Sequence, residues 1–485
     1  MKGYDNMPMF GYVTNSNSNN VSVIDTDALS PTFNTEVDVV PLGGTFTPLA
    51  IAITPDSTRA YIANFNADNV SVIDTNPNSP TFNTEIDVIP SSGNGPVGVA
   101  ITPDGTRAYI ANNLSSNVSV IDIDPSSPTY NTEVDLIPLT LVANAGPFNL
   151  AVTPDGTRVY VADNGPSGSA FSPNSVSVID SNPSSPTYNT EVAVIPLSGV
   201  DPLFIDITPD GTRAYVTNIT SNNVSVIDTN PDSPTYNTEI DLISLTGTRP
   251  AGIVITPDGT RAYIANNSSN NLSVIDTDPN SITYNTQISL IPLSGVRPND
   301  VAITPDGARI YITNQSTNNV SIVDTNPASP TYNTEVDLIP LSGSSPYGIA
   351  IMQNPPPPPP TPTIALSTGS ILRQIPSTFY YTVSYLNNSP TEGAVIEVLV
   401  FYLPQGDSKR AYVHELFSIA PNESFSKLYR IPSDFVELQF GIRTTNPDNV
   451  LLSIWPLDVS GEPVNAEPVL ASDLVTIPNL TPNVP

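Results

Sequence analysis

The stretch that decides the fold runs Thr208-Pro-Asp-Gly-Thr-Arg-Ala-Tyr-Val-Thr-Asn218 and continues after a short gap with Asn223-Val-Ser-Val-Ile-Asp-Thr229. The same pattern occurs seven times in the chain, at intervals of 48–55 residues between its tyrosines. These tyrosines are Tyr12, Tyr61, Tyr109, Tyr160, Tyr215, Tyr263 and Tyr311. Such a repeat is typical of architectures that pack copies of one small unit together, since a single unit cannot bury its apolar face alone.

Each repeat contains four short segments that favour β-strands, separated by residues that favour turns. In the unit at 298–340, the expected strands are Asp300–Thr304, Arg309–Asn314, Val320–Asp324 and Glu335–Pro340. Between the first two, Thr-Pro-Asp-Gly predicts a tight turn, because proline presets φ and glycine accepts a left-handed conformation. Four strands repeated seven times predict an all-β fold, a seven-bladed β-propeller.

The two ends of the repeat region suggest how the ring closes. The first unit begins at its second strand, Gly11–Asn15, and the last unit is followed by an additional inner-strand segment at 347–352. Pairing of this segment with the N-terminal blade would complete the seventh sheet. We therefore expect residues 1–9 to be an N-terminal tail and residues 10–353 to be the closed propeller.

Two segments after the propeller differ from it in composition. Residues 354–363 contain six consecutive prolines, which predicts a semi-rigid polyproline linker. Residues 364–485 do not repeat, and they contain alternating apolar and polar stretches, such as Tyr380–Leu386, between turn residues. This pattern predicts a C-terminal antiparallel β-sandwich of immunoglobulin-like or jelly-roll type.

Residues 10–352 resemble the YVTN-family β-propeller repeats of surface-layer and envelope proteins. The resemblance rests on Tyr12-Val-Thr-Asn15 and on the two segments at 208–218 and 223–229. It implies a propeller over most of the chain, but the fold hosts many functions, so it specifies no activity. The N-terminus lacks the apolar run of a signal peptide, which departs from the ordinary export of such proteins.

The composition limits the chemistry that the chain can perform. Its 485 residues include 46 acids and 15 bases, a net charge of −31, and such a surface repels nucleic acid and anionic membranes. The chain has no cysteine, which excludes thiolate catalysis, disulfides and cysteine metal sites, and His414 is its only histidine. Neither a Ser-His-Asp set nor a phosphate-binding glycine loop is present. We therefore predict no catalytic residue and no cofactor.

Charged residues that recur in the repeats are expected to be structural. The arginine before the repeat tyrosine and the aspartate that ends the third strand favour hydrogen bonds or ion pairs within a blade. The outer strands carry carboxylates two residues apart, such as Glu335 and Asp337, which could contribute to a Ca²⁺ site. Because Ca²⁺ takes about six to eight oxygen ligands, protection of the outer edge is the favoured interpretation and no metal site is predicted.

Residues that break the repeat are more informative about a ligand site. In a propeller, the connections between blades and the loops between second and third strands meet at one mouth of the central channel. An enlarged loop at 164–174 lies on that side, and unusual charged residues occur there and in the inner strands. The candidates for ligand binding are Asp201, Asp206, Arg249, Arg297 and Asp300. Since they fall on neighbouring blades, we predict that they share one sector of the channel mouth.

The leading hypothesis is a non-enzymatic surface or interaction protein, with the propeller as a binding or structural module and the C-terminal domain for attachment or assembly. The expected partner is a protein or glycan at the cell or spore surface, without nucleic acid or membrane insertion. The expected location is the cell envelope or spore surface, with the cytoplasm as the alternative. Two other functions remain open: a lactonase-like propeller hydrolase, which would use the five candidates as acid, base and electrostatic groups, and a lectin-like module that binds glycan or protein.

Overall fold

The computed structural model describes residues 9–44, 46–140, 144–165 and 173–352 with their side chains, and after residue 352 the backbone of the strands alone. The chain divides into two compact units, Met1–Pro355 and Pro356–Pro485. The polyproline segment, most of the predicted N-terminal tail and most of the enlarged loop lie outside the described residues. Within the described ranges, no helix has the length and apolarity of a membrane span.

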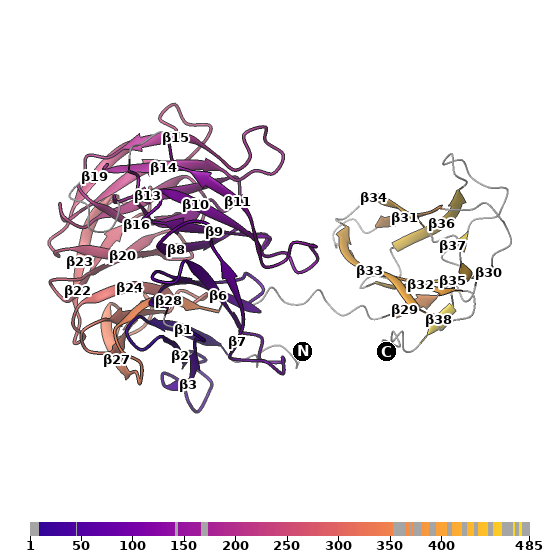
Figure 1. Cartoon of the computed structure of the whole chain (residues 1–485), viewed down its shortest axis with the longest axis horizontal. Helices are drawn as coiled ribbons and strands as arrows, with labels where there is room; N and C mark the ends of the chain where they lie inside the picture. Colours follow the sequence, from indigo (N-terminus) through magenta and orange to yellow (C-terminus); the bar gives the residue numbers. More distant parts are fainter. Residues whose placement is uncertain are drawn as a thin grey trace. The chain divides into compact units, whose positions relative to one another are not determined.

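The first unit is a ring of seven four-stranded antiparallel sheets, the blades, which we number 1 to 7 in the chain order of their second strands (Figure 1). The inner strands of blades 1 to 7 are β28 (Pro346–Ile351), β4 (Pro48–Ile53), β8 (Pro96–Ile101), β12 (Pro147–Val152), β16 (Pro202–Ile207), β20 (Pro250–Ile255) and β24 (Pro298–Ile303). The second strands are β1 (Phe10–Asn15), β5 (Arg59–Asn64), β9 (Arg107–Asn112), β13 (Arg158–Asp163), β17 (Arg213–Asn218), β21 (Arg261–Asn266) and β25 (Arg309–Asn314). The third strands are β2 (Asn20–Asp25), β6 (Asn69–Asp74), β10 (Asn117–Asp122), β14 (Ser175–Asp180), β18 (Asn223–Asp228), β22 (Asn271–Asp276) and β26 (Asn319–Asp324). The outer strands are β3 (Glu36–Pro41), β7 (Thr84–Pro90), β11 (Thr132–Pro138), β15 (Thr190–Pro196), β19 (Thr238–Ser244), β23 (Thr286–Pro292) and β27 (Thr334–Pro340). The predicted seven-bladed, all-β propeller is confirmed.

Blade 1 combines strands from the two ends of the propeller. Strand β28 pairs antiparallel with β1, with Gly11 opposite Ile351 and Val13 opposite Ile349. The N–H of Met352 then donates to the carbonyl of Phe10 at 2.9 Å. The ring is thus closed by main-chain hydrogen bonds between segments more than 330 residues apart, and every inner strand has a second strand beside it (Figure 1).

The apolar core of the propeller lies between neighbouring blades. The second and third strands are buried along nearly their whole length, whereas the outer strands are largely exposed. In one cluster, Tyr109 of blade 3 packs with Leu150 and Val161 of blade 4. Because both faces of a blade are covered in this way, the apolar residues that alternate along its strands hold the ring together.

The repeat tyrosines also latch each blade to the next through their hydroxyl groups. Tyr12 donates to Asn83 Oδ1 at 2.8 Å, and Tyr311 closes the series by donating to Asn34 Oδ1, also at 2.8 Å. The other latches are Tyr61 to Asn131, Tyr109 to Asn189, Tyr160 to Asn237, Tyr215 to Asn285 and Tyr263 to Asn333. Each accepting asparagine has a φ near +55°. Asparagine tolerates this left-handed conformation, which accounts for its recurrence in the loop before the outer strand.

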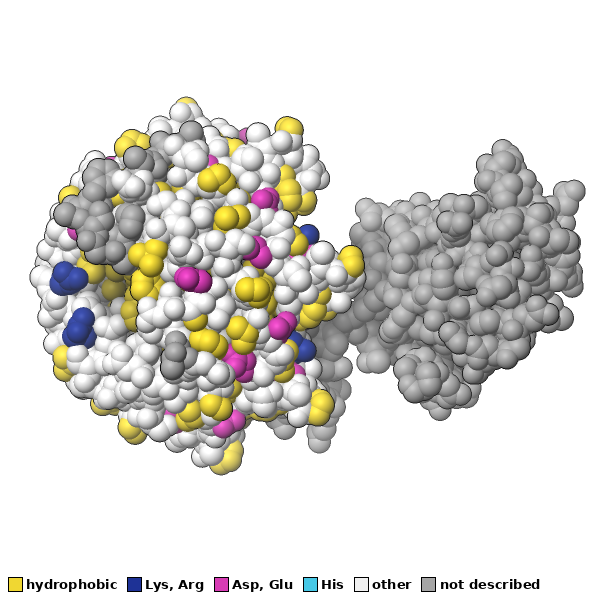
Figure 2. Space-filling view, in the orientation of Figure 1, with side chains coloured by type: hydrophobic (Ala, Val, Ile, Leu, Met, Phe, Trp, Pro, Cys, Tyr) yellow, Lys and Arg dark blue, Asp and Glu magenta, His cyan; other side chains and the backbone are white. Residues whose placement is uncertain are grey.

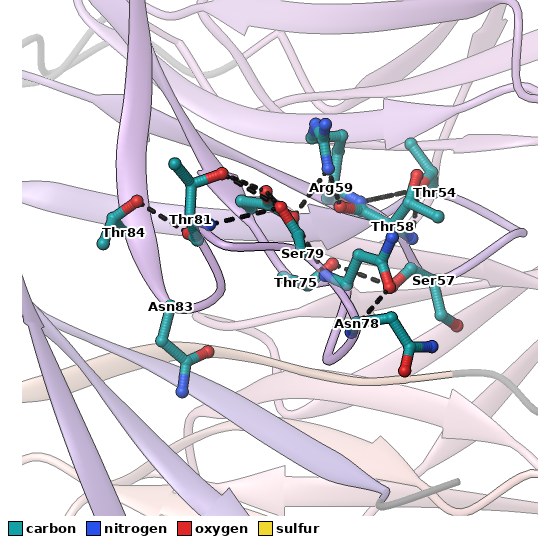
Figure 3. A network of polar contacts seen from close by, with 12 residues as sticks. Thr54, Ser57, Thr58, Arg59, Thr75, Asn78, Ser79, Thr81, Asn83 and Thr84 are labelled. Atoms are coloured by element: carbon teal, nitrogen blue, oxygen red, sulfur yellow. Dashed lines mark hydrogen bonds and ion pairs between the residues drawn. The ribbon is translucent and has the colours of Figure 1, made fainter. Parts of the chain in front are cut away.

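The recurring arginine and aspartate have the structural role predicted for them. In blade 2, Arg59 Nη1 lies 2.7 Å from Asp74 Oδ1, and equivalent ion pairs occur in blades 3 to 6. Ser79 and Thr81 donate to the second oxygen of Asp74, so the carboxylate fixes the loop that precedes the outer strand (Figure 3). Burial alone would raise the pKa of Asp74, but these hydroxyls and the guanidinium hold it below its usual range.

The second unit contains two antiparallel sheets. Their strands are β29 (Ile364–Ser367), β30 (Ile371–Leu372), β31 (Tyr380–Asn387), β32 (Ala394–Pro404), β33 (Arg410–Ile419), β34 (Ser424–Arg430), β35 (Phe435–Thr444), β36 (Val450–Leu457), β37 (Val469–Leu470) and β38 (Val475–Ile477). One sheet has the order β33-β32-β35-β29-β38, with β30 beside β35, and the other has the order β34-β31-β36-β37. The side chains of this unit, including His414, lie outside the described residues. Face-to-face packing of the sheets as a sandwich therefore stays a prediction.

Candidate functional site

The connections between blades and the loops between second and third strands meet at the end of the channel where the inner strands begin, which we call the upper mouth. Main-chain bonds join the two kinds of loop: Asn267 N–H donates to the carbonyl of Arg249 at 2.9 Å, and Gln315 N–H donates to that of Arg297 at 3.0 Å. In all seven connections, the residue before the first proline of the inner strand has a positive φ. Two of these seven residues, Gly95 and Gly146, are glycines.

Arg249 and Arg297 occupy this strained position in the adjacent blades 6 and 7, with φ values of 57° and 59°. A side chain in the left-handed region costs roughly 1–2 kcal/mol, whereas glycine adopts it freely. Both arginines are exposed, and neither takes part in an ion pair in the described part of the chain. Their backbone is held by Asn222 and Asn270, whose Oδ1 atoms accept the arginine N–H at 2.7 and 2.9 Å. The two guanidinium groups are thus displayed to solvent on a fixed backbone, an arrangement suited to binding an anion.

Asp201 occupies the same position in blade 5, with a φ of 58°. Its Oδ2 accepts a hydrogen bond from the Thr220 hydroxyl, and its N–H donates to Asn174 Oδ1 at 3.0 Å. The carboxylate is therefore engaged with its own blade. The structure places Asp201 at the upper mouth, as predicted, but in a role that stabilises the loop.

Asp300 lies in β24, three residues after Arg297, and is partly buried. Its Oδ2 accepts the N–H of Ile349 in the next inner strand at 3.1 Å, and its Oδ1 accepts the N–H of Val301 at 2.9 Å. Burial raises the pKa of Asp300 to about 7, although the two N–H groups lower it in part. Gly252 permits this arrangement, because a Cβ at that position would lie 2.7 Å from the Asp300 Cα.

Asp206 makes an analogous contact in β16. Its Oδ2 accepts the N–H of Ile255 in the next inner strand at 2.7 Å, and burial raises its pKa to about 6. Counted from the first proline of its strand, Asp206 lies two positions further along than Asp300 does, toward the opposite end of the channel. The strand β20 also separates the two acids around the ring. The five predicted residues therefore fall into two sets. Four lie at or near the upper mouth: Asp201, Arg249, Arg297 and Asp300. Asp206 lies deeper in the channel.

Three aromatic residues of the inner strands were missed by the sequence reasoning. Phe148 and Phe204, in the adjacent blades 4 and 5, form an edge-to-face pair with ring centroids 5.8 Å apart. Tyr347 of β28 has a raised pKa, first because of burial and then because of the negative charge of Asp300, which places this ring near the acid. These residues could have been recognised in the sequence, because the residue type varies between blades at the positions just after the first proline of each inner strand. Figure 2 shows a hollow in the ring with apolar side chains inside it and Lys or Arg side chains on its edge.

The outer-strand acids accept hydrogen bonds from neighbouring blades. Glu85 Oε2 accepts the N–H of Gly43 at 2.7 Å, and Asp38 Oδ2 accepts the side-chain N–H of Asn83 at 3.1 Å. Among the residues described with side chains, no group of three or more Asp, Glu, His or Cys is arranged to hold a metal ion.

The grooves on the opposite face are repeated features of the blades. One of about 390 Å³ lies between blades 4 and 5 and is lined by residues that include Arg158 and Tyr236. An equivalent groove of about 560 Å³, with Arg107 and Tyr188 in its lining, lies between blades 3 and 4. Since their arginines belong to the structural ion pairs, these grooves are less specific as candidate sites than the upper mouth.

The fold and the charged groups define the class: a seven-bladed β-propeller with a polar site at one mouth of its channel. Residues 8–138, 47–238 and 233–341 match the family described as lactonase, 7-bladed β-propeller. These matches cover more than half of the sequence, so the chain belongs to this lactonase family. No curated protein matches the chain in sequence.

Solved structures of similar fold come from several bacteria. A putative 6-phosphogluconolactonase from Bacteroides fragilis is 16% identical, with a TM-score of 0.58, over 72% of this chain and 99% of its own. The periplasmic gluconolactonase of Pseudomonas aeruginosa is 16% identical, with a TM-score of 0.55, over 72% of this chain and 100% of its own. A protein of unknown function from Desulfotomaculum acetoxidans is 19% identical, with a TM-score of 0.57, over 71% of this chain and 99% of its own. At these identities the likeness concerns the fold.

Family membership corrects the functional prediction. The hypothesis of a non-enzymatic surface or interaction protein is wrong, because the chain belongs to the lactonase family of seven-bladed propellers. That hypothesis rests on the regular repeat, the acidic composition and the lack of a catalytic motif in the sequence. The family supports instead the alternative that the sequence left open, a lactonase-like propeller hydrolase.

Proposed function

We propose that the propeller is a hydrolase that opens a lactone ring at the upper mouth of its channel. The observation that carries the proposal is the carboxylate of Asp300, which is partly buried, has a pKa of about 7 and follows Arg297 closely in the sequence. Membership of the lactonase family supports this choice of reaction. We also propose that the blades are related in sequence to YVTN-family repeats. That relationship by itself implies no enzymatic activity.

Asp300 would act as the general base. Its pKa of about 7 leaves roughly half of the carboxylates ionised at neutral pH, which is the range where a base accepts a proton efficiently. The carboxylate takes a proton from water while the water oxygen attacks the lactone carbonyl carbon. The ring C–O bond then breaks, and the proton passes from Asp300 to the departing alkoxide. The product is a hydroxy acid, and Asp300 returns to its ionised state.

Arg249 and Arg297 would bind the anionic part of the substrate or the negative charge that develops on the carbonyl oxygen. Both functions suit guanidinium groups, which donate several hydrogen bonds to phosphate or carboxylate oxygens. The similar structures named as a 6-phosphogluconolactonase and a gluconolactonase suggest a sugar lactone, with or without a phosphate group. The paired rings of Phe148 and Phe204 offer an apolar surface in neighbouring inner strands.

Hydrolysis of six-membered sugar lactones by the full-length chain, followed by pH-stat titration, tests the proposal. We expect Asp300→Asn to reduce kcat/KM by a factor of about 10² or more, and the wild-type rate to rise with pH through about 7. The matched control is Asp232→Asn, which removes an exposed carboxylate from the loop before the outer strand and should leave the rate unchanged. Equal rates for wild type and Asp300→Asn would refute the assignment of the base.

A further inference from the structure

Blade 4 differs from the other blades at a position that is buried throughout the ring. The second strands of six blades end in an asparagine, whereas that of blade 4 ends in Asp163. The asparagines are Asn15, Asn64, Asn112, Asn218, Asn266 and Asn314. All seven side chains are 0% exposed to solvent. An acid has thus replaced an amide at a site without solvent, where an uncompensated charge is costly.

In the other six blades, the asparagine is a hydrogen-bond donor. Its Nδ2 donates to the hydroxyl of a serine in the third strand at 2.7–2.9 Å, as Asn218 does to Ser225. The serine hydroxyl thus accepts from the asparagine and keeps its own hydrogen for another group. A carboxylate cannot reproduce this arrangement, because it has no hydrogen to donate.

The contacts of Asp163 leave one hydrogen too few. Its Oδ2 lies 2.9 Å from the hydroxyls of both Ser175 and Ser177. The hydroxyl of Ser177 also lies 2.9 Å from Glu191 Oε1. The hydroxyl of Ser177 has a single hydrogen, which it can donate to Asp163 or to Glu191 but not to both. If both acids were ionised, the Ser177 oxygen would therefore face one carboxylate oxygen with no hydrogen between them. A proton on Asp163 resolves this: Asp163 donates to Ser177, as asparagine does elsewhere, and Ser177 donates to Glu191.

The electrostatic surroundings favour that proton. Burial, and then the negative charge of Glu191, raise the pKa of Asp163 well above its usual range, while the serine hydroxyls lower it in part. The neighbouring strand β12 carries no charged residue. Arg158 and Asp180 lie at the other ends of β13 and β14 and form an ion pair with each other. Asp201, beyond Asn174, is bound to Thr220. No basic group among these neighbours neutralises Asp163.

We propose that Asp163, Ser177 and Glu191 form a buried proton-binding site that holds one shared proton at neutral pH. The site adjoins the upper mouth: Asn164, the next residue in the chain, donates from Nδ2 to the carbonyl of Pro202 at 3.0 Å. Pro202 follows Asp201 in the connection to blade 5. Loss of the proton places two negative charges around Ser177 and weakens blade 4 at the channel mouth. The proposal stands independently of lactone hydrolysis.

Thermal unfolding of the full-length chain as a function of pH tests the proposal. An acid that is protonated in the folded chain and ionised in the unfolded chain makes stability fall as pH rises above about 4, until the folded group also ionises. We expect the Tm of wild type to fall by about 2–6 °C relative to that of Asp163→Asn as the pH is raised from 5 to 9. The variant copies the asparagine of the other blades, so it is expected to fold.

Two further variants distinguish this site from a general effect of charge. Glu191→Gln copies Gln287 of blade 6 and should also reduce the pH dependence of Tm. Asn218→Asp places an acid beside Ser225 in blade 5, where Glu239 is the equivalent of Glu191, and should add a second pH-dependent loss of Tm.

The infrared spectrum provides a direct readout. Wild type at pH 7 should show the C=O stretch of a protonated carboxylic acid that Asp163→Asn lacks. Identical pH profiles and identical infrared spectra for the two proteins would overturn the proposal. A rise in Tm on adding 1 mM CaCl₂ that occurs in wild type and is absent in Asp163→Asn would also overturn it, since a cation would then replace the proton.

Discussion

Replacing Asp300 by asparagine should reduce hydrolysis by a factor of about 10² or more and at the same time stabilise the propeller at alkaline pH. The amide oxygen of asparagine can still accept the N–H of Ile349. Blade 4 provides the natural example, because Asn149 occupies the equivalent position and its Oδ1 accepts the N–H of Ile205 in the next inner strand at 3.3 Å. The substitution therefore removes the charge and preserves the hydrogen bond that joins the two inner strands.

The size of the stabilisation follows from the pKa of Asp300, which burial raises from 3.8 to about 7. The difference between these two pKa values corresponds to about 4 kcal/mol, because a tenfold change in acidity is worth about 1.4 kcal/mol. Since the side chain is only partly buried, we expect about half of this, roughly 2 kcal/mol. The folded chain keeps its proton up to about pH 7 while the unfolded chain loses it near pH 4, so stability falls across this window and then levels off.

The assay compares the Tm of the full-length wild type and Asp300→Asn at pH 4 and pH 9. At pH 4 Asp300 is neutral in the folded chain and only about half ionised in the unfolded chain, so the difference in stability should be small. At pH 9 the Tm of the variant should be higher by about 4 °C or more, although its activity is reduced. A variant that is less stable than wild type at pH 9, or a difference that does not change with pH, would refute the assignment of a buried, destabilising carboxylate.

Three other substitutions test different parts of the structure. Arg249→Ala combined with Arg297→Ala should raise KM for an anionic lactone about tenfold or more with little change in Tm, because both side chains are exposed; an unchanged KM would exclude anion binding there. Tyr215→Phe removes the 2.8 Å hydrogen bond to Asn285 and should lower the free energy of unfolding by about 1 kcal/mol, measured by urea denaturation, whereas no loss would show that the latch is energetically neutral. Gly252→Ala places a Cβ 2.7 Å from the backbone of the next inner strand and should lower Tm, with a cost of about 1–3 kcal/mol; retention of the wild-type Tm would mean that the inner strands move apart easily.

The candidate site was only partly predictable. The residues before the first prolines, such as Arg249 and Arg297, could be found because they depart from the repeat. The sequence did not separate Asp201, which is bound to Thr220, from Asp300, which accepts backbone N–H groups beside the channel. The missed ring of Tyr347 lies near Asp300 because the last inner strand follows blade 7 in the closed ring.

The sequence by itself determined the number of blades, the order of strands within each blade and the positions of the turns. Those properties depend on local patterns: alternation along short strands, proline and glycine in the hairpin turns, and a tyrosine that recurs at a nearly constant interval. The blade that breaks the pattern at Asp163 was also visible in the sequence.

Only the tertiary structure decided which groups carry unusual protonation. Asp300 meets Ile349 and Asp206 meets Ile255 across 49 residues of chain, because neighbouring inner strands lie side by side around the channel. A carboxyl group changes its pKa in response to burial and to the groups beside it, and both are properties of the assembled ring. In an unfolded chain of the same sequence, these acids would have the ordinary pKa of an aspartate.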